Sequence, residues 1–178
     1  MDKGPLEWHD LVTFLKGEPA WDPARGMVIP LPSDMVKIRG REGVHLCCFY
    51  DDAARGCSIY AGRPLECRTL KCWDTREIEA LFLKDMLSRR AICNDRPELL
   101  ELLDEYDRMY GVEAIREMLG VSGVADHAET ARFVEASRVH RARSLGLLSL
   151  DERAGDFLFG RDAAGVIEGI VAARRYGL

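Results

Sequence analysis

Residues 44–73 of the chain read VHLCCFYDDAARGCSIYAGRPLECRTLKCW. This stretch holds five of the six cysteines of the sequence, and the sixth is Cys93. Clustering of this density is typical of a disulfide framework in a small secreted protein, and of a metal site in an intracellular one. The clustered cysteines are Cys47, Cys48, Cys57, Cys67 and Cys72.

The size of the chain favours the metal interpretation. With 178 residues it is long enough to fold as one domain, residues 1–178, around a hydrophobic core that needs no covalent staples. The first ten residues contain no basic flank that leads into an apolar stretch, so we expect a cytoplasmic protein whose thiols stay reduced. A structural disulfide is the alternative.

Charge and hydropathy argue against two classes of partner. The formal net charge of −5 disfavours a general nucleic-acid binder, which neutralises phosphates with Lys and Arg. No apolar run approaches the roughly 18 residues of a membrane span, so we expect no membrane partner. The expected partner is a metal ion, and an additional protein partner stays open.

Thiolates are soft ligands that suit zinc and iron–sulfur clusters and poorly suit calcium or magnesium. A structural zinc site takes four ligands, and a 4Fe-4S cluster likewise takes four cysteines. We therefore expect zinc or iron, bound by four ligands drawn mainly from the clustered cysteines. No residue pattern predicts a catalytic site.

The local pattern predicts a short β-hairpin followed by a turn. Strand formers at 44–50 and 57–60 flank a turn at 51–56, which brings Cys47 or Cys48 close to Cys57. Residues 61–64 then turn the chain, and Cys67 and Cys72 follow on a loop or a single helical turn.

The rest of the chain, residues 74–177, is predicted to be helical. The evidence is a capping pair at Asp74 and Glu77, Pro97 at a helix start, and stops at Gly111 and Gly120. Further helices are expected over residues 126–144, after a cap at 149–152, and over 163–177. A helix is also expected over residues 5–16, where apolar residues have helical spacing, and short extended pieces over 24–40. The predicted fold is mainly α, with a small irregular or β-hairpin cysteine-rich metal knuckle at 44–73.

The run from Cys57 to Arg68, CSIYAGRPLECR, resembles a known signature. It is similar to the C-x-I-Y-x-x-R-P-x-x-C-R core of the YkgJ-like cysteine-cluster family, described as a zinc- or iron-chelating domain. Cys47 and Cys48 match the last two cysteines of the family's upstream C-x-x-C-C element, and Val44 stands where the first would be. The resemblance implies chelation of zinc or iron, and a related module resembles part of a flagellin lysine methylase.

The identity of the fourth ligand is open at this stage. Adjacent side chains of a regular strand point to opposite faces, so a strand would offer only one of Cys47 and Cys48. His45 could replace the cysteine missing at Val44, and Cys93 could fold back as a remote ligand. Four basic residues could offset the thiolate charge: Arg55, Arg63, Arg68 and Lys71. Alternatively, Arg63 and Arg68 could form ordinary ion pairs with Asp51, Asp52 or Glu66.

The sequence thus predicts a cytoplasmic metal-binding protein in which the ion organises the fold. The alternative is an iron–sulfur redox protein, or an accessory to a protein-modifying enzyme, so whether the chain is an enzyme is open. Without metal, we expect residues 44–73 to lose their order while the helices partly survive.

Overall fold

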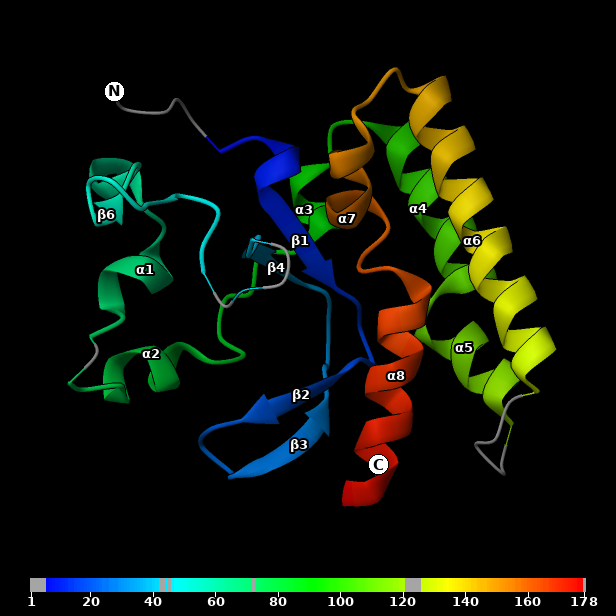
Figure 1. Cartoon of the computed structure of the whole chain (residues 1–178), viewed down its shortest axis with the longest axis horizontal. Coiled ribbons are helices and arrows are strands. Elements are labelled where there is room, and N and C mark those ends of the chain that lie inside the picture. Colours follow the sequence, from blue (N-terminus) through cyan, green and yellow to red (C-terminus); the bar gives the residue numbers. More distant parts are fainter. Residues whose placement is uncertain (1–5, 42–43, 45, 72, 121–125, 178) are drawn as a thin grey trace.

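The computed structural model describes residues 6–41, 44, 46–71, 73–120 and 126–177 (Figure 1). About 52% of it is helical, and the strands form small antiparallel sheets of two strands each. This confirms a mainly α fold with minor β structure. The helices are α1 (Leu65–Thr69), α2 (Arg76–Leu81), α3 (Arg89–Ile92), α4 (Pro97–Tyr110), α5 (Val112–Leu119), α6 (His127–Leu147), α7 (Gly155–Leu158) and α8 (Ala163–Ala173). The strands are β1 (Leu11–Phe14), β2 (Pro19–Asp22), β3 (Met27–Pro30), β4 (Met35–Ile38), β5 (Tyr50–Asp51) and β6 (Gly56–Cys57).

The prediction of a helix over residues 5–16 is wrong. Residues Trp8–Asp10 form one 3-10 turn, and β1 follows and pairs with β4, Leu11 lying opposite Ile38. Leu11 and Thr13 are buried on one face of β1, and the Thr13 hydroxyl donates to the carbonyl of Phe157 at 2.6 Å. Contact with α7 therefore favours the strand, whose side chains alternate between faces, over the helix that the apolar spacing suggested.

The extended pieces expected over residues 24–40 are confirmed by β3 and β4. β3 forms a hairpin with β2 in which Pro19 lies opposite Pro30. A proline lacks a backbone N–H, so its place at the end of a two-stranded ladder leaves no donor of the sheet unpaired.

Four of the predicted helices are confirmed, as α4, α5, α6 and α8. Pro97 opens α4, Gly111 and Gly120 end α4 and α5, and the Asp126 carboxylate caps α6 by accepting the N–H of Ala128. These helices enclose two apolar clusters. One packs α4 against α7 and β1, and the other joins α5, α6 and α8.

Two predicted helix starts are different in the structure. The Asp74 carboxylate accepts the N–H of Arg76, the first residue of α2, rather than that of Glu77, and it also binds the Arg76 side chain. α2 ends at Leu81, and Leu83 and Asp85 beyond it have positive φ angles. Asp151, not Ser149, caps the turn that leads into α7, since its carboxylate accepts the N–H of Arg153.

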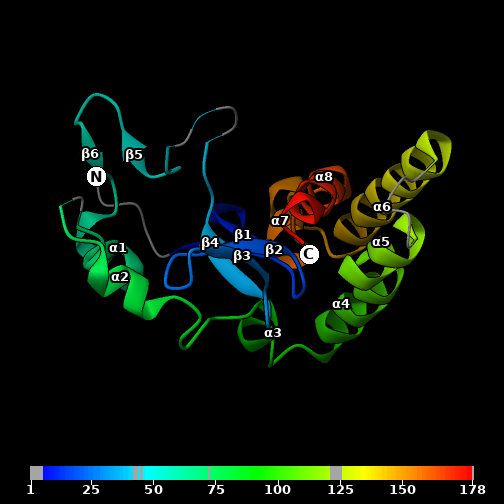
Figure 2. The ribbon, with the colours of Figure 1, turned by 90° about the horizontal axis from the view of Figure 1, so that it is seen from below.

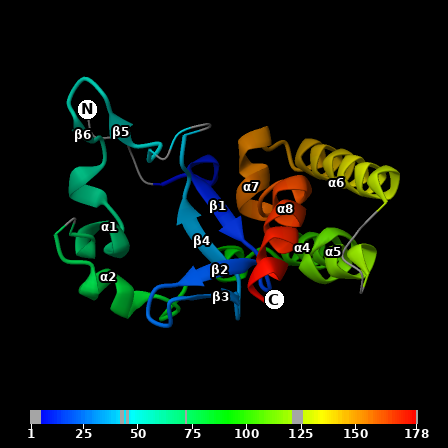
Figure 3. The same ribbon diagram turned by 60° about the horizontal axis from the view of Figure 1, so that its bottom comes forward.

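The described residues of 46–81, here called the cysteine lobe, comprise β5, β6, α1 and α2. They lie to one side of strands β1–β4 and helices α4–α8 (Figures 1, 2 and 3). Only Phe49 and Ile59 are buried among them. The lobe therefore has almost no hydrophobic core. In the part of the chain with known placement, no helix combines the length and apolarity that crossing a bilayer demands.

Candidate metal centre

Cys47 lies in a turn at the entrance to the β5–β6 hairpin, not in a regular strand. Its backbone forms an isolated bridge with Gly40, and its carbonyl accepts the N–H of Tyr50 at 3.0 Å. The N–H of Phe49 donates to its Sγ at 3.4 Å. Because the backbone turns here, the alternation of a regular strand does not decide between Cys47 and its neighbour Cys48.

The β5–β6 hairpin positions Cys57. Its register sets Cys57 opposite Tyr50, which confirms the predicted hairpin. Asp51 shapes the turn, because its carboxylate accepts the N–H groups of Ala53 and Ala54, both at 2.9 Å. These two backbone hydrogen bonds, first that of Ala54, lower the pKa of the Asp51 carboxyl.

Cys67 lies on α1, the single short helix that follows Pro64. Desolvation raises the pKa of its thiol, and the negative charges of Cys47 and Cys57 raise it further, while the Arg63 guanidinium acts in the opposite direction. The thiol of Cys67 therefore lies within range of the charges of Cys47 and Cys57, which come from separate segments of the chain.

Arg63 and Arg41 hold the hairpin and α1 in place. The Arg63 guanidinium lies 3.8 Å from the centre of the Tyr60 ring, a cation–π contact. Arg41 donates to the carboxylate of Asp52 at 2.6 Å and to the carbonyl of Tyr50. Arg41 lies outside residues 44–73, so the cysteine motif did not identify it as part of the site. One indication of its role was present in the sequence, a positive charge near an acidic pair.

The ion pairs considered for Arg63 and Arg68 with nearby carboxylates do not form in the described residues. Asp52 pairs with Arg41 instead, and Lys71 pairs with Glu77 of α2. Two cations interact electrostatically with the thiols: Arg63 acts on Cys67, and Arg41 interacts with Cys47.

The other candidate ligands differ in their position. Cys48 is half-buried, and its N–H donates to the carbonyl of Arg39 at 3.1 Å. Cys72 and His45 fall outside the described residues. Cys93 as a remote ligand is wrong, because its side chain is 0% exposed in the core between α4 and α7.

The remaining histidines were expected to be surface residues on helices. His127 is exposed at the start of α6. His140 differs, since its ring lies 5.8 Å from the Tyr106 ring and 5.5 Å from the Tyr110 ring and its Nε2 is buried. It packs against aromatic rings far from the cysteine lobe.

No group of three or more His, Cys, Asp or Glu side chains within residues 6–41, 44, 46–71, 73–120 and 126–177 is arranged to hold a metal ion. No disulfide joins Cys47, Cys57, Cys67 and Cys93 to one another. A metal site built on the first three of these thiols therefore needs a closer approach of their sulfur atoms, or a ligand from outside the described residues.

No family model, curated protein or solved structure matches this chain. The resemblance to the YkgJ-like family therefore rests on the motif between Cys57 and Arg68, together with the cysteine pair upstream.

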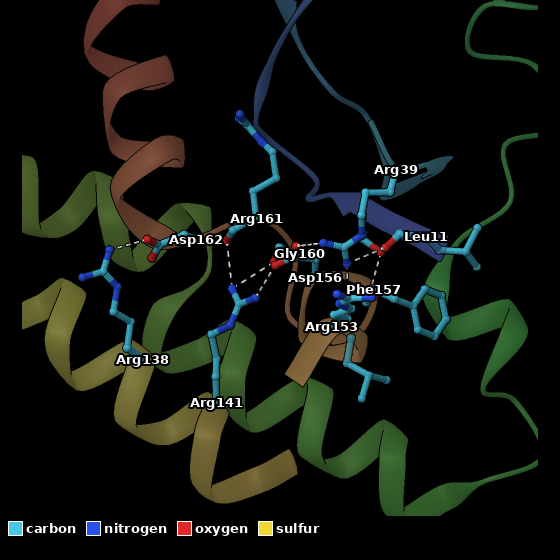
Figure 4. Close-up of polar contacts among 12 residues, drawn as sticks. Leu11, Arg39, Arg138, Arg141, Arg153, Asp156, Phe157, Gly160, Arg161 and Asp162 are labelled. Carbon is cyan, nitrogen blue, oxygen red and sulfur yellow. Dashed lines mark hydrogen bonds and ion pairs between the residues drawn. The ribbon is translucent and has the colours of Figure 1, made fainter. Parts of the chain in front are cut away.

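A second polar cluster lies between β4, α6 and α7. Arg39 and Arg141 converge on the carboxylate of Asp156, at 2.6 and 2.7 Å, and nearby Arg138 pairs with Asp162 (Figure 4). The cluster borders a cavity of about 640 Å³. Its arginines are bonded to carboxylates or to backbone carbonyls, so the cluster ties the three elements together and offers no free charge at its centre.

Proposed function

We propose that this protein binds zinc or an iron–sulfur cluster in its cysteine lobe, and that the bound metal organises the lobe. Cys47, Cys57 and Cys67 would supply three thiolates, with Cys48 and Cys72 as the further candidates. The observation that carries the proposal is the clustering of Cys47, Cys57 and Cys67 from separate segments of the chain, with the charges of Cys47 and Cys57 both acting on the Cys67 thiol. The motif shared with the YkgJ-like family supports it, and a reducing compartment such as the cytoplasm suits it.

The small core of the lobe supports a structural role for the metal. Burial of Phe49 and Ile59 contributes about 1.5–3 kcal/mol each. Backbone ordering costs about 1–2 kcal/mol for every residue of the lobe, so the burial of two side chains cannot offset the total cost. Metal–thiolate bonds in small zinc modules contribute roughly 10–16 kcal/mol of stabilising free energy. This is the size of the contribution that the lobe needs in addition to its small core.

The surroundings of the thiols fit such a group. The N–H of Phe49 already donates to Sγ of Cys47, and the charge of Arg63 acts on Cys67. Hydrogen bonds to sulfur and nearby positive charge stabilise thiolates and tune iron–sulfur clusters. When bound, zinc would act as a closed cross-link between turns, whereas an iron–sulfur cluster would add electron transfer.

Metal analysis of protein purified without oxygen tests the proposal. We expect either one zinc per chain in a colourless protein, or iron and sulfide in a brown one. The variants Cys57→Ser and Cys67→Ser should lose most of the metal. The matched control is Cys93→Ala, which removes a thiol from the core and should keep the full metal content.

Wild-type protein that contains neither metal after anaerobic purification, and takes up neither zinc nor iron in reconstitution, would overturn the proposal. Equal metal content in the Cys57, Cys67 and Cys93 variants would overturn the assignment of the ligands. A brown protein with reversible reduction would favour the redox function over the structural one.

A further inference from the structure

A cleft of about 760 Å³ lies outside the cysteine lobe, between α5, α8 and the β2–β3 hairpin. α5 and the end of α8 form two of its walls, and the ends of β2 and β3 form the third. α8 contacts both β2 and α5, so the cleft lies where three elements meet (Figures 1 and 3). Its size falls within the range of about 300–1,000 Å³ that is typical of small-molecule sites.

Two arginines face this cleft, and within the described residues their side chains donate hydrogen bonds only to backbone carbonyls. Arg116 donates through Nη2 to the carbonyl of Gly17 at 3.1 Å, and Arg174 donates through Nη2 to the carbonyl of Gly120 at 3.2 Å. Each guanidinium has five N–H donors, so most of them are unused. Nε of Arg116 is buried and has no hydrogen-bond partner within the described part of the chain.

Two glutamates on α5 line the same cleft. Glu113 and Glu117 lie one turn apart and exposed at its rim. Neither carboxylate forms an ion pair or a hydrogen bond with another described residue, although Arg116 lies between them on the helix. Both signs of charge are therefore present in one cleft without neutralising each other.

This arrangement differs from that of arginines elsewhere in the protein. Arg89 pairs with Asp34 and Asp107, and Arg161 pairs with Glu18. These two structural arginines are thus each bonded to a carboxylate. The two arginines of the cleft have no carboxylate partner among the described residues. This is expected of a site in which a ligand supplies the anion.

The floor of the cleft is apolar. Ile170 and Ala173, on the inner face of α8, are each 5% exposed and border it. A ligand that satisfies the whole site must carry an anionic group, a cationic group and a small apolar body.

We propose that this cleft binds a free α-amino acid with an apolar side chain. Its carboxylate would accept hydrogen bonds from Arg116 and Arg174, its ammonium group would lie at Glu113 and Glu117, and its side chain would cover Ile170. The site is separate from the cysteine lobe, so it does not depend on the proposed metal.

Titration of the full-length, metal-replete protein tests the proposal. The probes are leucine, isoleucine, valine and methionine, with 4-methylpentanoate and isopentylamine as analogues that each keep one charged group of leucine. At least one amino acid should bind and shift the amide resonances of Gly17, Arg116 and Arg174. Each analogue should bind about tenfold or more weakly, because one charged contact is lost.

Two pairs of variants test the residues. Arg174→Gln and Glu117→Gln should each weaken amino-acid binding about tenfold or more, whereas Arg175→Gln and Glu168→Gln, exposed neighbours that do not line the cleft, should leave it unchanged. Circular dichroism verifies that all four variants fold. Absence of binding by every amino acid at millimolar concentration, or analogues that bind as well as leucine, would overturn the proposal.

Discussion

Sγ of Cys47 accepts a hydrogen bond from the backbone N–H of Phe49, with the two atoms 3.4 Å apart. The Phe49 side chain is 2% exposed and is one of two buried side chains in the cysteine lobe. The residue that anchors the lobe is therefore also the residue that orients a candidate ligand. Loss of the metal and loss of the lobe's order should thus occur together.

Removal of metal should loosen the cysteine lobe and leave the helices intact. With a chelator present, we expect the amides of Tyr50, Ser58 and Leu70 to lose protection from hydrogen exchange, since little apolar burial holds their turns. Amides of α4 and α6 serve as the internal control and should keep their protection. Unchanged exchange throughout the lobe would contradict a structural metal.

Arg89 should contribute far more to stability than its neighbour Arg90. The Arg89 side chain is 1% exposed and joins Asp34, Asp107 and the carbonyl of Leu158. Arg89→Met should lower the free energy of unfolding by about 3–5 kcal/mol, because it breaks a buried ion-pair network and leaves Asp34 with the N–H of Lys16 and Asp107 with Arg90 alone. Arg90 is 38% exposed, so Arg90→Met should cost about 0–1 kcal/mol. Urea unfolding measures both, and equal losses would contradict this role of Arg89.

Gly160 should not tolerate a side chain. Its φ is +76°, and an added Cβ would lie 2.8 Å from Cγ of Leu15. Gly160→Ala should therefore destabilise the protein by about 1–3 kcal/mol. Gly165→Ala in α8 is the matched control, since nothing lies within 4 Å of its added Cβ, and it should stabilise the helix by about 0.5–1 kcal/mol. Thermal unfolding of the two variants should shift in opposite directions.

Cys93 should make stability fall at alkaline pH. Burial raises the pKa of its thiol above the usual range, and the positive charges of Arg96 and Arg89 offset this only in part. The unfolded thiol ionises near pH 8.5, so the folded state keeps a proton that the unfolded state has lost. Its contribution is complete below about pH 8.5 and decreases as the pH rises toward the raised pKa.

The measurement compares unfolding free energies of the wild type and Cys93→Val between about pH 8 and 10. The wild type should lose more stability over this range, and parallel curves would contradict the prediction. In the folded wild type, Cys93 should also resist thiol reagents that modify the exposed Cys67, until the protein unfolds.

Some of the fold follows from short-range patterns alone. α4, α5 and α6 were predictable because Pro97, Gly111, Gly120 and Asp126 start or stop helices through their own backbone and side-chain chemistry. The β5–β6 hairpin was predictable for the same reason, since the turn around Asp51 is stabilised by hydrogen bonds to residues two and three positions away.

Other features depend on residues that are distant in the sequence. The apolar spacing from Trp8 to Leu15 fits a helix, yet Leu11, Thr13 and Leu15 also alternate as in a strand. Pairing with β4 and packing on α7 decided between these, and the local sequence encodes neither partner. Cys93 likewise could not be separated from the clustered thiols until the core between α4 and α7 enclosed it.

The sequence by itself determined which residues carry the sulfur chemistry, because residue type and spacing are local properties of the chain. Only the tertiary structure decided that the Cys47 turn, β6 and α1 lie close enough for the charges of Cys47 and Cys57 to act on the Cys67 thiol, and that Arg41 binds Asp52 of the hairpin turn. Electrostatic forces depend on distances through space, and folding sets those distances.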